Sequence, residues 1–407
     1  MDERKAAAVK VMERLEKAGF QAYMVGGCVR DEMLKITPQD YDIATDARPD
    51  DVQNLFPRTI PTGLKHGTVT VVEQGIPLEV TTFRVEEEYL DRRRPSKVRF
   101  VSSLKQDLAR RDFTMNAMAK NRQGQVIDYF SGREDLLAGR IRTVGNPYER
   151  FREDALRMLR AARFVAQFGF KLEEETKRAL IDLKAECLHL SVERVAQELE
   201  KMWKAKSPSA GVRVLFSTDL FRSLPPFCRW ELKPIPPEKA IFFDEAPDRI
   251  VRWAYLLYLC QTDENHLSKR LKALKLPVRD QQQLYSCFML MRKWEAKDAV
   301  YWKRQLLRYG LTAVRQAGVL RKIAGERTEK DPTEKQLLDW WNEMPIKERR
   351  ELALSGQDLI HYCGKKAGPW VGQVLNDLFE QVALGFLPND RNVLLEEGYK
   401  IGKVDSQ

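Results

Sequence analysis

The sequence has few of the residues that build metal centres and disulfide frameworks. Its 407 residues include only six cysteines and four histidines. The cysteines are scattered and form no CxxC pair, so neither a zinc site nor a disulfide framework is indicated, and reduced thiols are expected. The histidines show no ligand spacing and receive no catalytic role; they are His66, His189, His266 and His361.

Long apolar runs are also missing. No stretch approaches the roughly 20 apolar residues that a helix needs to cross a bilayer. The charged amphipathic segment 1–20 differs from a signal peptide. There is no internal repeat and no low-complexity tract, and the hydrophobic fraction of 43% is ample for real cores. We therefore expect a folded cytoplasmic protein with no membrane partner.

The sequence has an excess of basic residues. Lysine and arginine number 69 against 59 aspartates and glutamates, which gives a formal charge of +10. A basic protein of this size suits a polyanionic partner, and nucleic acid is the commonest one. A positively biased surface without such a partner remains the alternative.

Hydrophobic patterns divide the chain into two kinds of sequence. Up to about residue 145, short strand patterns alternate with helical ones, which predicts a mixed α/β domain with a small sheet. The predicted strands cover residues 21–27, 40–45, 66–85 (as a hairpin) and 126–130. From Tyr148 onward the spacing is helical. Prolines predict loop-rich connections at 207–227 and 232–249, and a further break lies at 364–369.

A glycine pair follows the first predicted strand. In the segment 26–31, GGCVRD, glycine allows backbone N–H groups to approach an anion, and Arg30 adds a fork of charged donors. Gly27 and Arg30 are therefore candidate phosphate ligands. An ordinary tight turn is the competing interpretation.

Two carboxylates open the next predicted strand. Asp40 and Asp42 are two residues apart, so they point to the same face. Like charges this close destabilise the fold unless a cation lies between them. Oxygen ligands of this kind suit Mg²⁺, and Glu79 is a candidate third carboxylate. The residue between them, Tyr41, should point the other way and serve packing; a solvated strand end is the alternative for the pair.

Four motifs in order resemble a known family. They are GGCVRD at 26–31, DYD at 40–42, RRDFTMNAMA at 110–119 and EDALRMLRAARF at 153–164. Together they resemble the class II CCA-adding enzymes and bacterial poly(A) polymerases of the DNA polymerase β superfamily. A weaker similarity to the bacillus-type enzymes continues at 351–360 and 367–375.

The resemblance implies an α+β fold. A polymerase β-like α/β nucleotidyltransferase head with a small mixed sheet would precede an all-helical neck, body and tail. The implied boundaries are 1–145 for the catalytic head, 146–206 for the neck with the nucleotide-selecting motif, 207–325 for the body and 326–407 for a tail that binds tRNA.

It also implies a reaction. The enzyme would add C, C and A stepwise to the 3′ end of tRNA from CTP and ATP, without a template, by two-metal phosphoryl transfer that releases pyrophosphate. Asp40 and Asp42 would hold Mg²⁺ while Gly27 and Arg30 hold the triphosphate. Little covalent work falls to the protein, so positioning and charge neutralisation should supply most of the rate.

Base selection is assigned to the fourth motif. Asp154 and Arg157, three apart on a predicted helix, would share one face. A carboxylate can accept a hydrogen bond from the exocyclic amine of cytosine or adenine, while a guanidinium donates a hydrogen bond to the ring nitrogen. Uracil and guanine would leave both charges unpaired, which is the costly mismatch.

Further arginines repeat along the same helix. Arg157, Arg160 and Arg163 form a basic stripe, for which a surface salt-bridge face is the competing interpretation. By resemblance these positions contact nucleotide. Arg111 would join them, Asp112 would contact the ribose or orient Arg111, and Glu153 would brace a turn.

The segment 86–98 is polar and highly charged and lies between two predicted strands. In the family this region is a flexible loop needed to add A after C, so its full length argues against an enzyme that adds only CC. A solvated loop without such a role is the alternative.

The tRNA partner would be recognised at its 3′ end and acceptor stem by shape and phosphate charge. Lys269, Arg270, Lys272 and Lys275 are candidates, although a solvated helix face explains them equally well. Core packing is expected for Trp253, Trp294 and Trp302.

Other functions stay open at this point. A poly(A) polymerase usually carries a basic extension before the glycine pair, where this chain has residues 1–25. The A-adding half of a split system is another alternative, and an inactive RNA-binding protein is a third. Unpaired carboxylates at Asp40 and Asp42 speak against the last. Family members are often dimers, so a homodimer is an alternative to a monomer.

Overall fold

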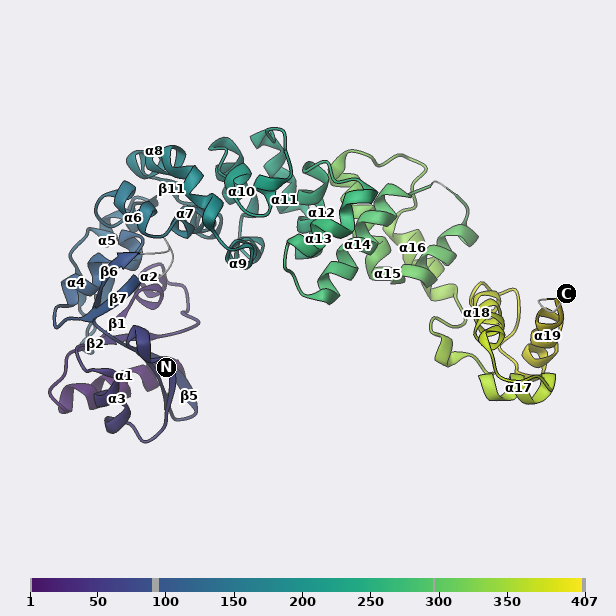
Figure 1. The fold of residues 1–407 in the computed structure, drawn as a ribbon, viewed down its shortest axis with the longest axis horizontal. Coiled ribbons are helices and arrows are strands. Elements are labelled where there is room, and N and C mark those ends of the chain that lie inside the picture. The colour runs from purple at the N-terminus through teal and green to yellow at the C-terminus, as the bar shows by residue number, and fades with distance from the viewer. Residues whose placement is uncertain (1, 90–94, 296, 405–407) are drawn as a thin grey trace. The chain divides into compact units, whose positions relative to one another are not determined.

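The computed structural model describes residues 2–89, 95–295 and 297–404 (Figure 1). The chain forms two compact units. The first comprises Met1–Asp244 with Ala273–Lys275, and the second comprises Glu245–Lys272 with Leu276–Gln407. In the described part of the chain no helix is both long enough and apolar enough to cross a membrane.

The first unit begins with a mixed sheet in the order β3-β4-β5-β2-β1-β8-β9. Only β2 and β5 pair in parallel, with Ile43 opposite Val80. The hairpin predicted at 66–85 is confirmed as β4 and β5, whereas β8 was not predicted. The strands are β1 (Ala22–Val25), β2 (Asp42–Thr45), β3 (Thr59–Gly63), β4 (Thr68–Glu73), β5 (Ile76–Thr82), β8 (Met118–Lys120) and β9 (Val126–Asp128).

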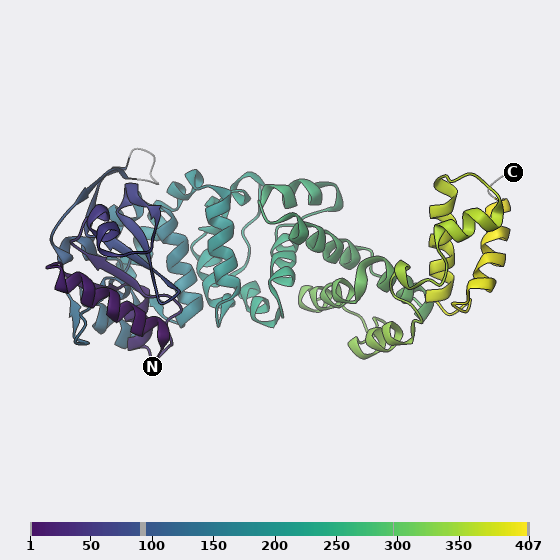
Figure 2. The same cartoon turned by 90° about the horizontal axis from the view of Figure 1, so that it is seen from below.

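Short helices cover this sheet. The first, α1 (Glu3–Lys17), is capped by the Asp2 side chain and buries an apolar stripe against the strands. It is the darkest helix in Figure 2, near the N-terminus. Its buried residues are Ala7, Ala8, Val11, Met12 and Leu15. The others are α2 (Gly27–Met33), α3 (Pro49–Leu55), α4 (Leu104–Ala109) and α5 (Gly132–Leu137), with 3₁₀ turns η1 (Leu64–His66) and η2 (Thr114–Asn116).

The loop predicted at 86–98 is wrong for most of its length. Two strands, β6 (Arg84–Tyr89) and β7 (Pro95–Phe100), pair as an antiparallel ribbon. Residues 90–94 of the predicted loop lie outside the described residues. The high charge of the segment misled the prediction, because cross-strand backbone pairing makes no demand for apolar side chains.

Helices make up most of the remainder of the first unit. They are α6 (Pro147–Glu153), α7 (Leu156–Phe168), α8 (Glu174–Leu183), α9 (Val192–Trp203), α10 (Pro208–Ser217) and α11 (Phe242–Glu245). One exception to the helical pattern is the two-residue pairing of β10 (Arg140–Ile141) with β11 (Lys171–Leu172). The loop-rich connection predicted at 207–227 is wrong in its first half, since Pro208 opens α10, where its missing N–H costs nothing.

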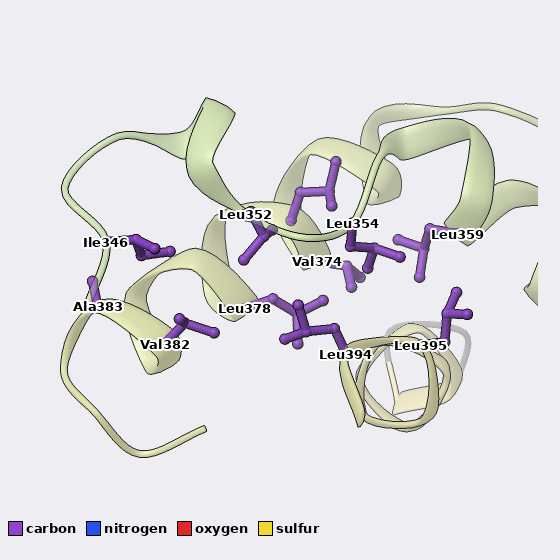
Figure 3. Packing of buried hydrophobic residues seen from close by; sticks show 11 residues of the cluster. Ile346, Leu352, Leu354, Leu359, Val374, Leu378, Val382, Ala383, Leu394 and Leu395 are labelled. Atoms are coloured by element: carbon purple, nitrogen blue, oxygen red, sulfur yellow. The ribbon is translucent and has the colours of Figure 1, made fainter. Parts of the chain in front are cut away.

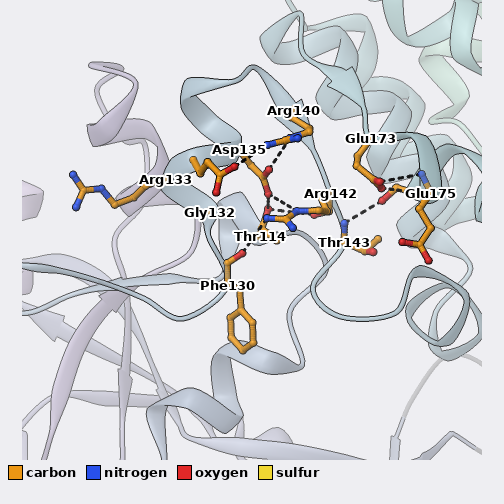
Figure 4. Close-up of polar contacts among 12 residues, drawn as sticks. Thr114, Phe130, Gly132, Arg133, Asp135, Arg140, Arg142, Thr143, Glu173 and Glu175 are labelled. Carbon is orange, nitrogen blue, oxygen red and sulfur yellow. Dashed lines mark hydrogen bonds and ion pairs between the residues drawn. The ribbon is translucent and has the colours of Figure 1, made fainter.

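A buried carboxylate ties the sheet domain to the strand that leads into these helices (Figure 4). Asp135 on α5 is fully buried. It accepts hydrogen bonds from the Thr114 hydroxyl at 2.6 Å, from Arg140 Nε at 2.9 Å and from Arg142 Nε at 2.8 Å. Because Thr114 lies in η2 and Arg140 in β10, Asp135 joins three segments.

Replacing Asp135 with asparagine should therefore destabilise the head. The amide keeps the shape of the side chain but removes its charge, so the two charge-assisted hydrogen bonds from arginine weaken. We expect the free energy of unfolding to fall by about 2–3 kcal/mol. Thermal and urea unfolding would measure the loss. Asp50→Asn on the exposed side of α3 is the control and should stay within about 0.5 kcal/mol. Equal stabilities of the two variants would contradict the prediction.

The second unit is helical. Two of the tryptophans predicted to be core, Trp253 and Trp302, are fully buried, and half-buried Trp294 packs on Trp302 with ring centroids 4.4 Å apart. The helices are α12 (Arg249–Leu259), α13 (Glu264–Ala273), α14 (Val278–Arg292), α15 (Ala299–Ala324), α16 (Glu334–Glu343), α17 (Gly356–Cys363), α18 (Pro369–Ala383) and α19 (Arg391–Val404).

The last three helices share an apolar core (Figure 3). Leu359 of α17, Leu378 of α18 and Leu394 of α19 are completely buried within it. The predicted break is confirmed, since Gly364 ends α17 in a left-handed conformation and Pro369 opens α18. The segment before α17 also contributes to this core, and α15 packs against it.

Candidate nucleotide and metal site

A cavity of about 900 Å³ lies in the first unit. Its lining is polar and carries eight arginines against five aspartates, which favours an anionic ligand. All the predicted site residues line it except Glu79. The arginines are Arg30, Arg84, Arg110, Arg111, Arg157, Arg160, Arg163 and Arg194, and the aspartates are Asp31, Asp40, Asp42, Asp112 and Asp154.

The two predicted metal ligands face this cavity. Asp40 precedes β2 and Asp42 opens it, and both are exposed. Tyr41 between them is buried and its hydroxyl lies 3.3 Å from Glu32 Oε1. The predicted alternation is thus confirmed. Within the described residues neither aspartate side chain has a cationic partner in an ion pair.

Electrostatics of this pair favour a cation. Desolvation by the surrounding protein and the charges of Glu79 and Asp40 raise the pKa of Asp42 to about 6, against the opposing effect of Arg111. Glu79 lies on β5, next to β2, but does not line the cavity. No three His, Cys, Asp or Glu side chains gather as a metal cage in the described part of the chain. The donor set is therefore two carboxylates, which fits Mg²⁺ completed by phosphate and water.

The glycine turn between β1 and α2 places an arginine beside these carboxylates. Gly26 has φ of 75°, and a Cβ there would lie 2.8 Å from Arg111 Nη1. Glycine is needed here both for the backbone conformation and for the close approach of Arg111. Cys28 lies in the first turn of α2, and burial and the Asp42 charge raise the pKa of its thiol to about 11, so it stays neutral at pH 7.

Contacts with neighbouring residues hold the Arg30 side chain in a fixed position in the cavity wall. Its side chain is mostly buried and lies over the Phe168 ring, 4.7 Å from the centroid. Nη1 donates to Asn116 Oδ1 at 2.6 Å, while Nε and Nη2 donate to Asp31 Oδ1 at 2.9 and 2.7 Å. The predicted phosphate fork is therefore a guanidinium that the protein already holds in place.

Asp112 orients a different arginine from the one predicted. Its Oδ2 accepts from Arg160 Nε at 2.8 Å and Nη2 at 2.6 Å, and its Oδ1 accepts from Asn116 at 3.0 Å. Burial alone would raise the pKa of Asp112, but Arg160 and these hydrogen bonds lower it to about 2. The prediction that Asp112 orients Arg111 is wrong, because Arg111 pairs with Asp107 at 3.3 Å.

The predicted arginine stripe exists, but each member has a carboxylate partner. The positive charge of each guanidinium group in the stripe is therefore balanced by a carboxylate. The pairs are Arg157 with Glu153, Arg160 with Asp112 and Arg163 with Glu198, each at 2.6 Å. Glu153 also pairs with Arg150, which confirms that it braces the junction of α6 and α7.

Asp154 and Arg157 do not lie on one helix, contrary to the prediction. Asp154 is extended, with φ of −145° and ψ of 102°, and α7 begins only at Leu156. Its Oδ1 accepts from the Leu156 N–H and its Oδ2 pairs with Arg194 of α9 at 2.7 Å. Aspartate favours such capping positions over helix interiors. Both residues nevertheless line the same cavity.

Sequence reasoning missed several residues at the cavity. Asn116 makes hydrogen bonds to both Arg30 and Asp112. It belongs to the motif at 110–119, so the motif itself could have indicated its role. Arg194 had no local signal, since its partner is 40 residues away. His66 also lines the cavity, although its spacing excluded it as a ligand.

Comparisons with known proteins match almost the whole chain. Residues 22–142 match the poly A polymerase head domain, 169–230 the probable RNA and SrmB-binding site of polymerase A, and 245–397 the putative tRNA nucleotidyltransferase domain 2. The CCA-adding enzyme of Geobacillus sp. (strain WCH70) is 41% identical over 96% of this chain and 95% of its own length. That of Bacillus velezensis (strain DSM 23117 / BGSC 10A6 / LMG 26770 / FZB42) is 40% identical over 97% and 98%.

Solved structures agree with these relatives. The Bacillus stearothermophilus CCA-adding enzyme in complex with CTP matches with a TM-score of 0.85 and 34% identity, covering 100% of this chain and 99% of that one. The Thermotoga maritima CCA-adding enzyme complexed with tRNA_CCA matches with a TM-score of 0.67 and 22% identity, covering 98% and 96%. The second similarity is one of fold. The predicted α+β fold, with a mixed sheet followed by helices, is confirmed.

Proposed function

The chain belongs to the family of CCA-adding enzymes, and on that premise we propose that it adds C, C and A stepwise to the 3′ end of tRNA from CTP and ATP, without a template. The observation that carries this proposal is the pair Asp40 and Asp42, which face an arginine-rich cavity without cationic partners in the described residues. A catalytically silent RNA-binding protein would have no reason to retain this electrostatic repulsion.

The proposed metal ligands are Asp40 and Asp42. Enzymes of this family are generally metal-dependent, and the two exposed carboxylates suit Mg²⁺. Bound there, Mg²⁺ would lower the barrier by activating the RNA 3′-hydroxyl and by neutralising the triphosphate. Glu79 would act as a third acidic group through its charge on Asp42, from the neighbouring strand.

Arg111 and the glycine turn are proposed to hold the triphosphate. Arg111 lies against Gly26, and its Nε is buried without an acceptor in the described part of the chain. A buried N–H without a partner is costly, so a phosphate oxygen nearby would be favoured. The backbone of Gly27 and the anchored side chain of Arg30 complete this end of the cavity.

Base selection is proposed for Asp154 and Arg157, which line the cavity together with Arg160 and Arg163. Glu153 and the carbonyl oxygens of Arg150 and Arg110 hold the Arg157 guanidinium in a defined orientation. Such preorganisation lets the site reject a base whose donors and acceptors are reversed, since it cannot relax around the mismatch. Asp112 contributes by fixing Arg160.

The wider architecture is proposed to follow the boundaries 1–145, 146–206, 207–325 and 326–407, with the tail binding tRNA and the protein acting in the cytoplasm. Exposed lysines such as Lys269 and Lys272 on α13 would contact phosphates. Arg270 is a poorer candidate than its sequence suggested, because it donates to the Cys260 carbonyl at 2.8 Å and to Thr262 Oγ1 at 2.9 Å.

An assay on defined RNA ends tests the function. We expect two C and then one A to be added to tRNA that ends at the discriminator base, and a single A to tRNA ending in CC, from labelled CTP and ATP. Removing divalent metal with EDTA should stop transfer, and added Mg²⁺ should restore it. Long A tracts would indicate a poly(A) polymerase. Addition of A to CC ends alone would indicate the A-adding half of a split system.

A further inference from the structure

One buried carboxylate holds the side chains of two neighbouring cavity arginines, Arg110 and Arg111. Asp107 on α4 is 1% exposed and does not line the cavity itself. Its Oδ1 accepts from Arg110 Nε at 2.9 Å and Nη2 at 2.8 Å, and from the Arg84 backbone N–H at 3.3 Å. Its Oδ2 accepts from Arg111 Nη2 at 3.3 Å.

These neighbours lead to both ends of the cavity. Arg111 lies against Gly26, at the end that carries Asp42. The carbonyl oxygen of Arg110 accepts from Arg157 Nη2 at 3.1 Å, at the end proposed to read the base. The side chain of Arg110 is fixed by Asp107, so the placement of this carbonyl depends on the same carboxylate.

We propose that Asp107 is a positioning residue for nucleotide transfer, acting through Arg111 at the triphosphate and through Arg110 and Arg157 at the base. The proposal rests on the proposed function of the cavity. It adds the residue that fixes the triphosphate-binding and base-reading arginines relative to each other. Two arginines side by side repel each other, and a carboxylate between them allows both to approach.

Asparagine at this position would keep the volume but not the role. Burial alone would raise the pKa of Asp107, but Arg110 and Arg111 outweigh it and keep the group ionised. An amide carries no charge, and its NH₂ group would turn a donor toward one guanidinium. The expected result is displacement of Arg111 and Arg110 with the fold retained.

A matched control exists in the second unit. Asp331 is 7% exposed and, like Asp107, accepts from an arginine side chain and a backbone N–H. Its donors are Arg321 Nε at 3.1 Å, the Thr328 N–H at 3.4 Å and the Thr328 hydroxyl at 3.0 Å, and neither residue lines the 900 Å³ cavity. Asp331→Asn therefore reports the effect of losing a buried carboxylate as such.

The experiment compares Asp107→Asn, Asp107→Glu and Asp331→Asn in the full chain. We expect Asp107→Asn to raise KM for CTP and ATP about tenfold and to lower kcat, with tRNA affinity unchanged. Asp107→Glu should recover part of the loss, and Asp331→Asn should leave both constants unchanged. Equal kinetic losses in Asp107→Asn and Asp331→Asn, or a loss in Asp107→Asn explained by its folded fraction in thermal unfolding, would overturn the proposal.

A double-mutant cycle separates positioning from general destabilisation. If Asp107 acts through Arg111, the loss from Asp107→Asn in an Arg111→Lys background should be several-fold smaller than in the unaltered chain. Multiplicative losses would overturn the proposal. Equilibrium CTP binding is measured in parallel, so that the role of Asp107 is decided even if the unaltered chain fails to add CCA. In that case weaker CTP binding by Asp107→Asn alone supports it, and equal or absent binding overturns it.

Discussion

Replacing Asp42 with alanine is expected to abolish nucleotide transfer, by at least about a thousandfold, while leaving tRNA affinity nearly unchanged. Asp42 is one of the two cavity-lining aspartates without a cationic partner among the described residues, and its pKa is raised to about 6 by desolvation and the charges of Glu79 and Asp40. The variant loses one of the two carboxylates proposed to hold Mg²⁺. Single-turnover addition of C and A, together with tRNA binding by filter retention, would measure both quantities.

Two further variants sharpen the test at Asp42. Asp42→Asn keeps the side-chain shape but removes the charge, so it should be about as inactive as alanine. Asp50→Ala, on the exposed surface of α3, is the control and should transfer normally. Activity of Asp42→Ala within tenfold of the unaltered chain would eliminate Asp42 as a metal ligand.

Arg157→Ala is expected to relax base selection. Loss of the guanidinium removes the donor proposed to face the ring nitrogen of C and A, so the preference for CTP over UTP should fall about 10- to 100-fold. Arg157 is 8% exposed and is held by Glu153. After truncation Glu153 still has Arg150 as a partner, which limits the structural damage. Competition between CTP and UTP, and between ATP and GTP, measures the ratio directly.

The control for base selection is Arg152→Ala. Arg152 is exposed on α6, one residue before Glu153, so its loss should not alter discrimination. Asp154→Asn should also relax selection, because an amide can accept or donate. Unchanged discrimination in Arg157→Ala would reject the base-reading proposal.

Local patterns in the sequence were sufficient to predict the strand that carries the proposed metal ligands. The buried Tyr41 between exposed Asp40 and Asp42 follows from the two-residue period of a strand. The β4–β5 hairpin and the break before α18 were equally readable, because turn residues and apolar spacing act over a few residues. The ribbon of β6 and β7 was missed, because backbone pairing between its strands leaves no pattern of apolar residues in the sequence.

Long-range ion pairs could not be read in this way. Asp112 meets Arg160, 48 residues away, and Asp154 meets Arg194, 40 residues away. Counting along a predicted helix suggested Arg157 as the neighbour of Asp154, and the family resemblance suggested Arg111 as one possible partner of Asp112. The boundary between α6 and α7 and the packing of α7 against α9 decided otherwise.

The sequence by itself determined the family, the order of its motifs and the direction in which strand residues such as Asp42 point, since these depend on local geometry and on residue type. Only the tertiary structure decided which charges distant in the chain meet, as Asp112 meets Arg160 and Asp154 meets Arg194. The reason is physical: a buried carboxylate is stable only with whichever donors packing brings within hydrogen-bond distance, and packing joins segments that no local pattern connects.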